Sequence, residues 1–125
     1  MSMQTIREKE RESLRHPRAV TPPVDVFENA DELLVVVDLP GVDKDGLVVR
    51  VDKGTLTLEA KAAERRAPAA YTKLGGEPRA EMFERVFTLP DTVDVERIVA
   101  ELKDGVATLR LPKSEKAKPR RIPIR

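Results

Sequence analysis

Apolar residues alternate with polar ones along most of the chain between Val24 and Leu111. Side chains two residues apart lie on the same face of a β-strand, so this period predicts strands that each bury one face. The runs are short and are separated by residues that favour turns, among them Asn29, Pro40 and Gly54. No stretch has the period of a convincing long helix. We therefore expect an all-β fold, an antiparallel β-sandwich of about seven to eight strands.

The apolar positions of these runs are the expected core, and three turns are expected between runs. The segment 43–46 reads as a turn, 52–54 as a tight hairpin and 103–105 as a further turn, each ending in glycine or containing it. The core positions are Val24, Val26, Leu33, Val35, Val37, Leu39, Leu47, Val49, Val51, Leu56, Leu58, Ala60, Phe83, Phe87, Leu89, Ile98, Ala100, Leu102, Ala107, Leu109 and Leu111.

The two ends of the chain lack this pattern. Residues 2–18 are dense in charge, and Ile6 and Leu14 are their only large aliphatic side chains. Two such residues bury too little apolar area to offset the entropy of ordering the segment, so we expect it to be mobile or weakly helical. The predicted organisation is a charged N-terminal arm over 1–20, one domain over 21–113 and a flexible C-terminal extension over 114–125.

The net charge of +1 conceals an acidic body and a basic tail. Residues 21–112 carry twelve Lys and Arg against eighteen Asp and Glu, whereas residues 113–125 carry six against one. A basic tail can contact nucleic-acid phosphates, but the acidic body would repel them, and aromatic residues make up only 3% of the chain. A solvated tail, or one docked on the acidic surface of a sister subunit, is therefore favoured over nucleic-acid binding.

Composition also bears on the compartment. The chain has no cysteine, which excludes disulfides and thiolate chemistry and gives no sign of an oxidising compartment. Residues 1–21 have no apolar core of a signal peptide, and no stretch approaches the ~18 apolar residues of a membrane span. We expect a cytoplasmic protein without membrane contact.

Residues that commonly carry chemistry are sparse or badly spaced. His16 is the single histidine, and no cysteine or second histidine exists to share a metal with it. Asp43 and Asp45 lack the remaining ligands of a calcium loop, and the pair Gly75-Gly76 lacks the strand-to-helix context of a phosphate loop. Nothing places two carboxylates in one pocket. We expect no metal, no cofactor and no catalytic residue, and hence no enzyme.

Four stretches of the chain, taken together and in their order, match the motifs of a known protein family. They are VVVDLPGV at 35–42, FERVFTLP at 83–90, AELKDGV followed by LRLPK at 100–113, and Ile-Pro-Ile at 122–124. Together they resemble the α-crystallin-domain family of small heat-shock proteins, over residues 21–125. In the third stretch Ala107 replaces the leucine of the family's Gly-Val-Leu signature, and Glu81 stands where the family usually has glycine. The resemblance implies an immunoglobulin-like sandwich, the α-crystallin domain.

The resemblance gives the C-terminal motif a role. In the family, the two apolar side chains of this motif enter a groove of another subunit, which here implies Ile122 and Ile124. Both point to one side of an extended segment that Pro123 keeps extended. Burying them contributes ~3–6 kcal/mol before the costs of ordering and association, so single tails bind weakly and several hold an assembly. The groove maps to Leu47, Val49 and Val51 and to Ile98, Ala100 and Leu102.

The resemblance also implies a dimer. In the bacterial and plant branch of the family, each subunit passes a strand from a long loop into the sheet of its partner. Here the loop is about 66–80, and residues 69–74 supply the strand, with Tyr71 and Leu74 at the interface. The glycines and the proline that follow are poor residues within a strand, so the exchanged strand is expected to be short.

Arg85 lies between Phe83 and Phe87, on the face where the alternation places apolar side chains. A charge there needs an acidic partner or a subunit boundary, because an unpaired buried charge is costly. Arg85 corresponds to the family's strand arginine close to the dimer interface. The alternative is an arginine at a strand edge that reaches water.

The implied function is that of an ATP-independent chaperone, a holdase, which binds unfolding proteins and prevents their aggregation. Its partners are client proteins and further copies of itself, as a homodimer and a larger homo-oligomer. The N-terminal arm of 1–20 has no aromatic residue, unlike the family's longer arms. This leaves two alternatives: the sandwich grooves carry client binding, or the protein is a weak holdase or a partner of other small heat-shock proteins. The alternative is a structural or co-chaperone adaptor resembling the CS-domain proteins, which lack the Ile-Pro-Ile tail.

Overall fold

The computed structural model describes residues 19–77 and 81–125. The expected count of strands and the lack of a long helix are confirmed for these residues. Most of the arm predicted over 1–20 lies outside them. The elements are β1 (Ala19–Val20), β2 (Val24–Glu28), β3 (Glu32–Asp38), β4 (Val42–Asp52), β5 (Thr55–Ala62), β6 (Met82–Thr88), the 3-10 turn η1 (Val95–Arg97), β7 (Val99–Lys103), β8 (Val106–Pro112) and the 3-10 turn η2 (Glu115–Ala117).

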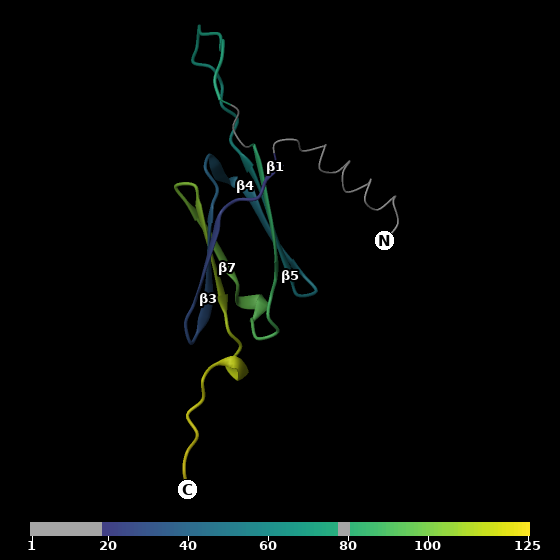
Figure 1. Cartoon of the computed structure of the whole chain (residues 1–125), viewed down its shortest axis with the longest axis vertical. Helices are drawn as coiled ribbons and strands as arrows, with labels where there is room; N and C mark the ends of the chain where they lie inside the picture. The colour runs from purple at the N-terminus through teal and green to yellow at the C-terminus, as the bar shows by residue number, and fades with distance from the viewer. Residues whose placement is uncertain (1–18, 78–80) are drawn as a thin grey trace, which may run out of the picture.

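The strands form two four-stranded sheets, and Figure 1 shows these sheets facing each other. The strand order is β1-β6-β5-β4 in one sheet and β2-β3-β8-β7 in the other. Every pairing between these strands is antiparallel except that of β1 with β6, which is parallel. The predicted β-sandwich is confirmed. The short β1 was not expected, because two residues carry no readable period.

The core lies between the sheets and follows the predicted alternation, except at Val26 and Ala100, which were expected in the core but are exposed because they lie on the two end strands of their sheet. In β3, Val35 and Val37 are buried, and they pair with the buried Leu109 and Ala107 of β8. Ala107 is fully buried, so the smaller side chain at this signature position still belongs to the core. The buried apolar residues are Val35, Val37, Leu39, Val42, Leu56, Leu58, Ala60, Phe83, Leu89, Val93, Ala107, Leu109 and Leu111.

The turn expected over 43–46 is wrong, because these residues form a bulge inside the continuous strand β4. The pairing of β4 with β5 shifts between Val42 and Leu47. The Asp43 carboxylate accepts a hydrogen bond from the backbone N–H of Gly46 at 3.2 Å. A Cβ at Gly46 would overlap the backbone carbonyl oxygen of Lys61 on β5, so glycine allows the close approach of the two strands. Residue types that usually form turns here form an irregularity within a strand.

Gly46→Ala is expected to destabilise the fold by ~1–3 kcal/mol, because the backbone of β5 must move to admit the methyl group. The free energy of unfolding in urea measures the effect. Gly75→Ala is the control, since nothing lies within 4 Å of a Cβ at Gly75. Equal stability of the two variants would contradict the packing argument.

Two tight hairpins join β4 to β5 and β7 to β8. Lys53 and Gly54 link β4 to β5 with φ of 48° and 77°, and Asp104 and Gly105 link β7 to β8 with φ of 51° and 74°. Positive φ at both loop residues is the type I′ geometry that fits the twist of a two-stranded ribbon. Both turn predictions are confirmed. Figure 1 shows the 63–77 loop projecting from one end of the sandwich and the C-terminal tail leaving from the other.

Candidate functional site

β4 and β7 are the end strands of opposite sheets, and they approach each other along one side of the sandwich. On β4, Val49 pairs with the buried Leu58 of β5, so Val49 faces the interior. Leu47 and Val51 lie two residues away and share that face. All three are partly buried and pack against the core, which leaves part of each accessible at the open side.

On β7, side chains also face the interior on the side that lies toward β4. Ala100 pairs with the buried Leu109, and Leu102 pairs with the buried Ala107, so both face the interior. Ile98 directly precedes β7 and packs on the core, as does Leu102. Ala100 itself is exposed, on an end strand of its sheet.

The structure thus brings the six predicted groove residues to one place, which we name the β4–β7 edge: Leu47, Val49, Val51, Ile98, Ala100 and Leu102. An end strand also leaves one row of backbone donors and acceptors unpaired. Inward-facing aliphatic side chains beside free backbone groups form a surface suited to an extended apolar segment. Binding at this edge stays a prediction.

The tail motif does not contact its own domain through its isoleucines. Ile122 is 79% exposed and Ile124 is 97% exposed, and Figure 1 shows the tail extending away from the sheets. The root of the tail is ordered by η2, where the Lys118 ammonium lies 2.9 Å from the Glu115 carboxylate. The hydrogen bond and charge of Lys118 lower the pKa of Glu115 below its ordinary value. This local contact therefore weakens as the pH falls through that lowered pKa.

Arg85 of β6 lies on the inner face, as the alternation predicts, because it pairs with the buried Leu58. Its guanidinium carbon is 5.6 Å from the centre of the Phe87 ring, a cation–π distance. Among the described residues, its guanidinium forms no ion pair. β1 covers β6 only at Met82 and Phe83, so the edge of β6 beside Arg85 is open within the described part of the chain.

The loop that was predicted to exchange a strand has no strand over 63–77. Its tip contains a turn, in which the Tyr71 N–H donates to the Pro68 carbonyl at 3.0 Å and Ala70 has φ of 68°. Tyr71 is 74% exposed and Leu74 is 96% exposed. Their place at a dimer interface remains a prediction.

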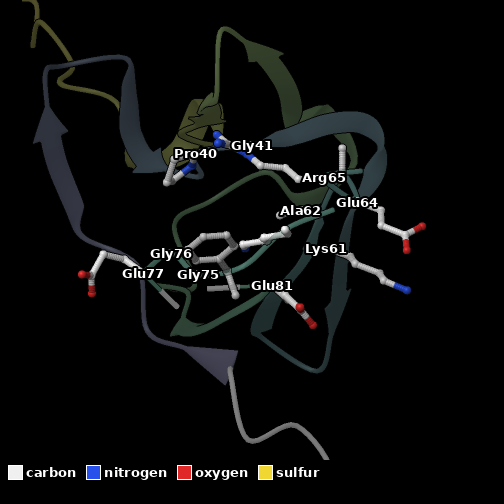
Figure 2. A pocket seen from close by; sticks show the side chains of 13 residues that line it. Pro40, Gly41, Lys61, Ala62, Glu64, Arg65, Gly75, Gly76, Glu77 and Glu81 are labelled. Carbon is white, nitrogen blue, oxygen red and sulfur yellow. The ribbon is translucent and has the colours of Figure 1, made fainter. Parts of the chain in front are cut away.

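A hollow of about 1220 Å³ lies between the base of this loop and the end of the sandwich. Phe83 and Ala62 form part of its lining, and Figure 2 shows Lys61, Glu64 and Glu77 extending away from its centre. The side chains therefore do not converge on a common point, as a catalytic or ligand site requires. Over residues 19–77 and 81–125, no three potential metal ligands come together.

Residues 25–125 match the sequence model of the Hsp20/alpha crystallin family, which is most of the chain. The chain belongs to the Hsp20/alpha crystallin family. It is 31% identical to small heat shock protein C4 of Rickettsia felis over 86% of this chain and 66% of that protein. It is 35% identical to heat shock protein 16 of Schizosaccharomyces pombe over 81% and 72%. It therefore spans about two thirds of the length of these relatives.

Solved structures share the fold. Heat shock protein 16.0 from Schizosaccharomyces pombe matches with a TM-score of 0.68 and 34% identity, over 85% of this chain and 99% of that one. A small heat-shock protein from Xylella fastidiosa, described as having a distinct high order structure, matches with a TM-score of 0.67 and 31% identity over 84% and 96%. The recognition of an α-crystallin domain from the four stretches is confirmed.

Membership of this family supports a chaperone function in general and disfavours catalysis, since its members are generally not enzymes. The described residues contain no helix that is both long and apolar enough to cross a membrane. Sequence reasoning missed the contact of the Lys113 ammonium with Glu28, at the start of the tail. A lysine that follows a strand gives no local sign of which residue its ammonium contacts.

Proposed function

We propose that this protein is an ATP-independent holdase that binds apolar segments of unfolding proteins and keeps them from aggregating. It works without a nucleotide, as a homodimer that assembles further through tail-to-edge contacts. The proposed organisation is that of an N-terminal arm over 1–20, a sandwich over 21–113 and a tail over 114–125. The proposed compartment is the cytoplasm.

The observation that carries the proposal is that one chain contains both an apolar edge, the β4–β7 edge, and an exposed apolar segment, the Ile-Pro-Ile tail motif. The β4–β7 edge offers inward-facing aliphatic side chains, and Ile122 and Ile124 of the tail are largely exposed to water. Each is the kind of surface that the other would bury. When heat weakens the contact, the edge becomes available to an extended apolar segment of a client.

The strength of one contact suits reversible assembly. Full burial of two isoleucines contributes ~3–6 kcal/mol, and immobilising the tail and the subunit offsets most of it. One tail therefore exchanges readily, while several tails acting together hold an assembly. A chaperone needs this balance, because its binding surface must open under stress without unfolding the domain.

A dimer through the 66–80 loop has a suitable acceptor in β2. This strand ends its sheet, so one of its edges is unpaired among the described residues. Val26 faces inward and Phe27 outward, and they are 57% and 56% exposed. An added strand with Tyr71 and Leu74 would pair the free edge and cover apolar side chains on both faces.

Suppression of heat-induced aggregation of a model client, followed by light scattering without nucleotide, tests the holdase function. We expect clear suppression at about equimolar subunits. Absence of suppression at every ratio would refute the proposed function and favour an adaptor role for the same sandwich.

Ala100→Glu tests whether the β4–β7 edge is the client surface. Because Ala100 is exposed, the domain should keep its fold, while a charged side chain over the edge should reduce suppression several-fold. Glu101→Ala is the matched control, since Glu101 lies on the opposite face of β7 and is exposed. Equal suppression by the two variants would place client binding elsewhere.

A further inference from the structure

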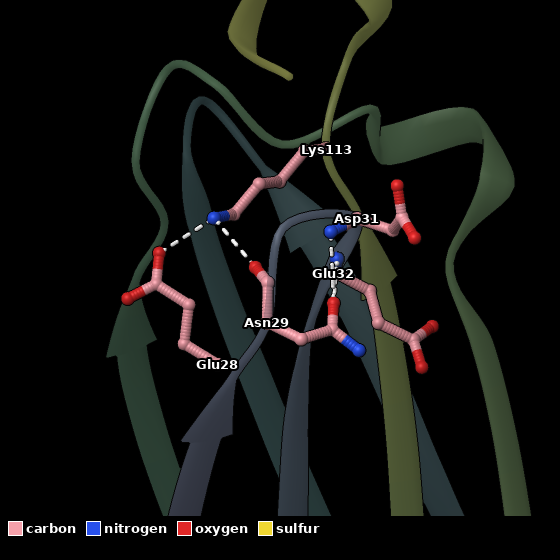
Figure 3. A network of polar contacts seen from close by, with 5 residues as sticks. All are labelled: Glu28, Asn29, Asp31, Glu32 and Lys113. Atoms are coloured by element: carbon pink, nitrogen blue, oxygen red, sulfur yellow. Dashed lines mark hydrogen bonds and ion pairs between the residues drawn. The ribbon is translucent and has the colours of Figure 1, made fainter. Parts of the chain in front are cut away.

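A cluster of polar contacts lies where the tail leaves the sandwich. In Figure 3 the Lys113 ammonium reaches past the end of β3 to the turn after β2. It lies 2.7 Å from a carboxylate oxygen of Glu28 and 2.9 Å from the backbone carbonyl oxygen of Asn29. The Lys113 side chain is 16% exposed, which is low for a lysine at the end of a strand.

The backbone around Lys113 is held as firmly as its side chain. The Lys113 N–H donates to the Asp31 carbonyl at 2.8 Å, and the next N–H, of Ser114, donates to the Thr92 carbonyl at 2.7 Å. On the opposite side of the turn, the Asn29 side-chain oxygen accepts hydrogen bonds from the N–H groups of Asp31 and Glu32, both at 2.8 Å. Hydrogen bonds therefore hold both the turn and the backbone at Lys113.

Lys113 connects two strands that do not pair with each other. Glu28 is the last residue of β2, whereas Lys113 follows the last residue of β8, and β3 lies between these strands. β2 is the acceptor strand in the proposed dimer, and Ser114 begins the tail that reaches another subunit. The Lys113–Glu28 contact is thus a direct physical link between the two proposed interfaces.

We propose that Lys113 is a positioning residue, which fixes the exit of the tail to β2 so that the dimer edge and the tail act as one rigid unit. This inference rests on the proposed assembly. Eight residues separate Lys113 from Ile122, a reach of at most about 30 Å. An anchored root confines the region that the motif samples, which raises its effective concentration at the edge of a neighbouring subunit.

Lys113→Ala tests this in the full chain. The variant removes the side-chain contact with Glu28 and leaves the backbone hydrogen bonds of Lys113 and Ser114 in place. The effective concentration of each tail is therefore expected to fall only about twofold, and the effect multiplies over the tails that hold an assembly. The concentration at which half of the dimers are in larger assemblies should therefore rise about three- to tenfold, measured by light scattering after size-exclusion chromatography. Lys113→Arg, which keeps a cation for Glu28, should restore most of the assembly.

Lys118→Ala is the matched control. It removes the ion pair with Glu115 at the same root, but that pair does not reach β2. We expect a shift of less than about twofold, since the exit of the tail stays fixed. Equal shifts for Lys113→Ala and Lys118→Ala, or no shift in either, would overturn the inference.

A variant that lacks the tail motif distinguishes a role of Lys113 in positioning the tail from a role in folding or dimer formation. In a protein without residues 119–125, Lys113→Ala should leave the dimer population unchanged, because no tail remains to position. Loss of dimers in that background would show a purely structural role and overturn the inference. If removal of 119–125 alone leaves the assembly size unchanged, the proposed tail-mediated assembly itself fails, whatever Lys113 does.

Discussion

Replacing both tail isoleucines, as Ile122→Ala with Ile124→Ala, is expected to reduce the assembly to dimers. Each change removes three carbon atoms from a side chain that the proposed contact buries, at ~0.8 kcal/mol per carbon and so ~4.8 kcal/mol for the two changes. The affinity of each tail should fall on the order of 3,000-fold. Both side chains are exposed in the single chain, so the stability of the domain should not change. Size-exclusion chromatography with light scattering measures the assembly.

Pro123→Ala is the control for this variant. It keeps both isoleucines and only loosens the extended segment, which costs less than about 1 kcal/mol per tail. We expect a partial shift toward smaller species. If the double variant elutes at the position of the unchanged protein, the isoleucines do not hold the assembly, and the tail contact must be abandoned.

Reversing the charge of Arg85, as Arg85→Glu, is expected to weaken the dimer at least about tenfold, which corresponds to ~1.4 kcal/mol. Arg85 faces inward on β6, where its guanidinium lies over the Phe87 ring and forms no ion pair within the described part of the chain. In the proposed dimer the loop of the partner reaches this side. Glu77 is the single acidic residue between 66 and 80, so it is the carboxylate that the loop can bring to Arg85.

The charge swap makes this pairing testable. Glu77→Arg alone should weaken the dimer as Arg85→Glu does, whereas the two changes together should restore it, because the opposite charges meet again across the interface. Dimer dissociation, followed by analytical ultracentrifugation on a background without residues 119–125, measures the effect. A double variant that is weaker than both single variants would show that Arg85 and Glu77 do not meet.

The fold was predictable because its signals are local and repeated. Alternation at Val35, Val37 and Leu39 predicts a strand with one buried face, and the structure buries all three. Glycine in the 52–54 hairpin signals positive φ, which the structure shows. The same reasoning failed over 43–46, where aspartates and glycine occur in a bulge. A bulge and a turn can both use a glycine and a carboxylate that accepts a backbone N–H, so residue types alone do not separate them.

Local patterns in the sequence predicted which residues of the candidate site share a face of a strand, but not how the two strands are arranged. Periodicity shows that Leu47, Val49 and Val51 share a face, and that Ala100 and Leu102 share another, but it does not show that these faces meet. Their meeting depends on β4 and β7 both lying at the ends of their sheets, on the same side of the sandwich. Strand order depends on contacts between residues far apart in the chain, which no local pattern records.

The sequence by itself determined most of the strands and most of the core positions, the family and the apolar tail motif, because each depends on residue types at short spacing. Only the tertiary structure decided that β4 and β7 share an open edge, that Arg85 faces inward without an ion pair in the described chain, and that Lys113 ties the tail root to Glu28. These features join residues up to 85 positions apart. The packing of two sheets brings such residues together, and that packing is a property of the whole domain.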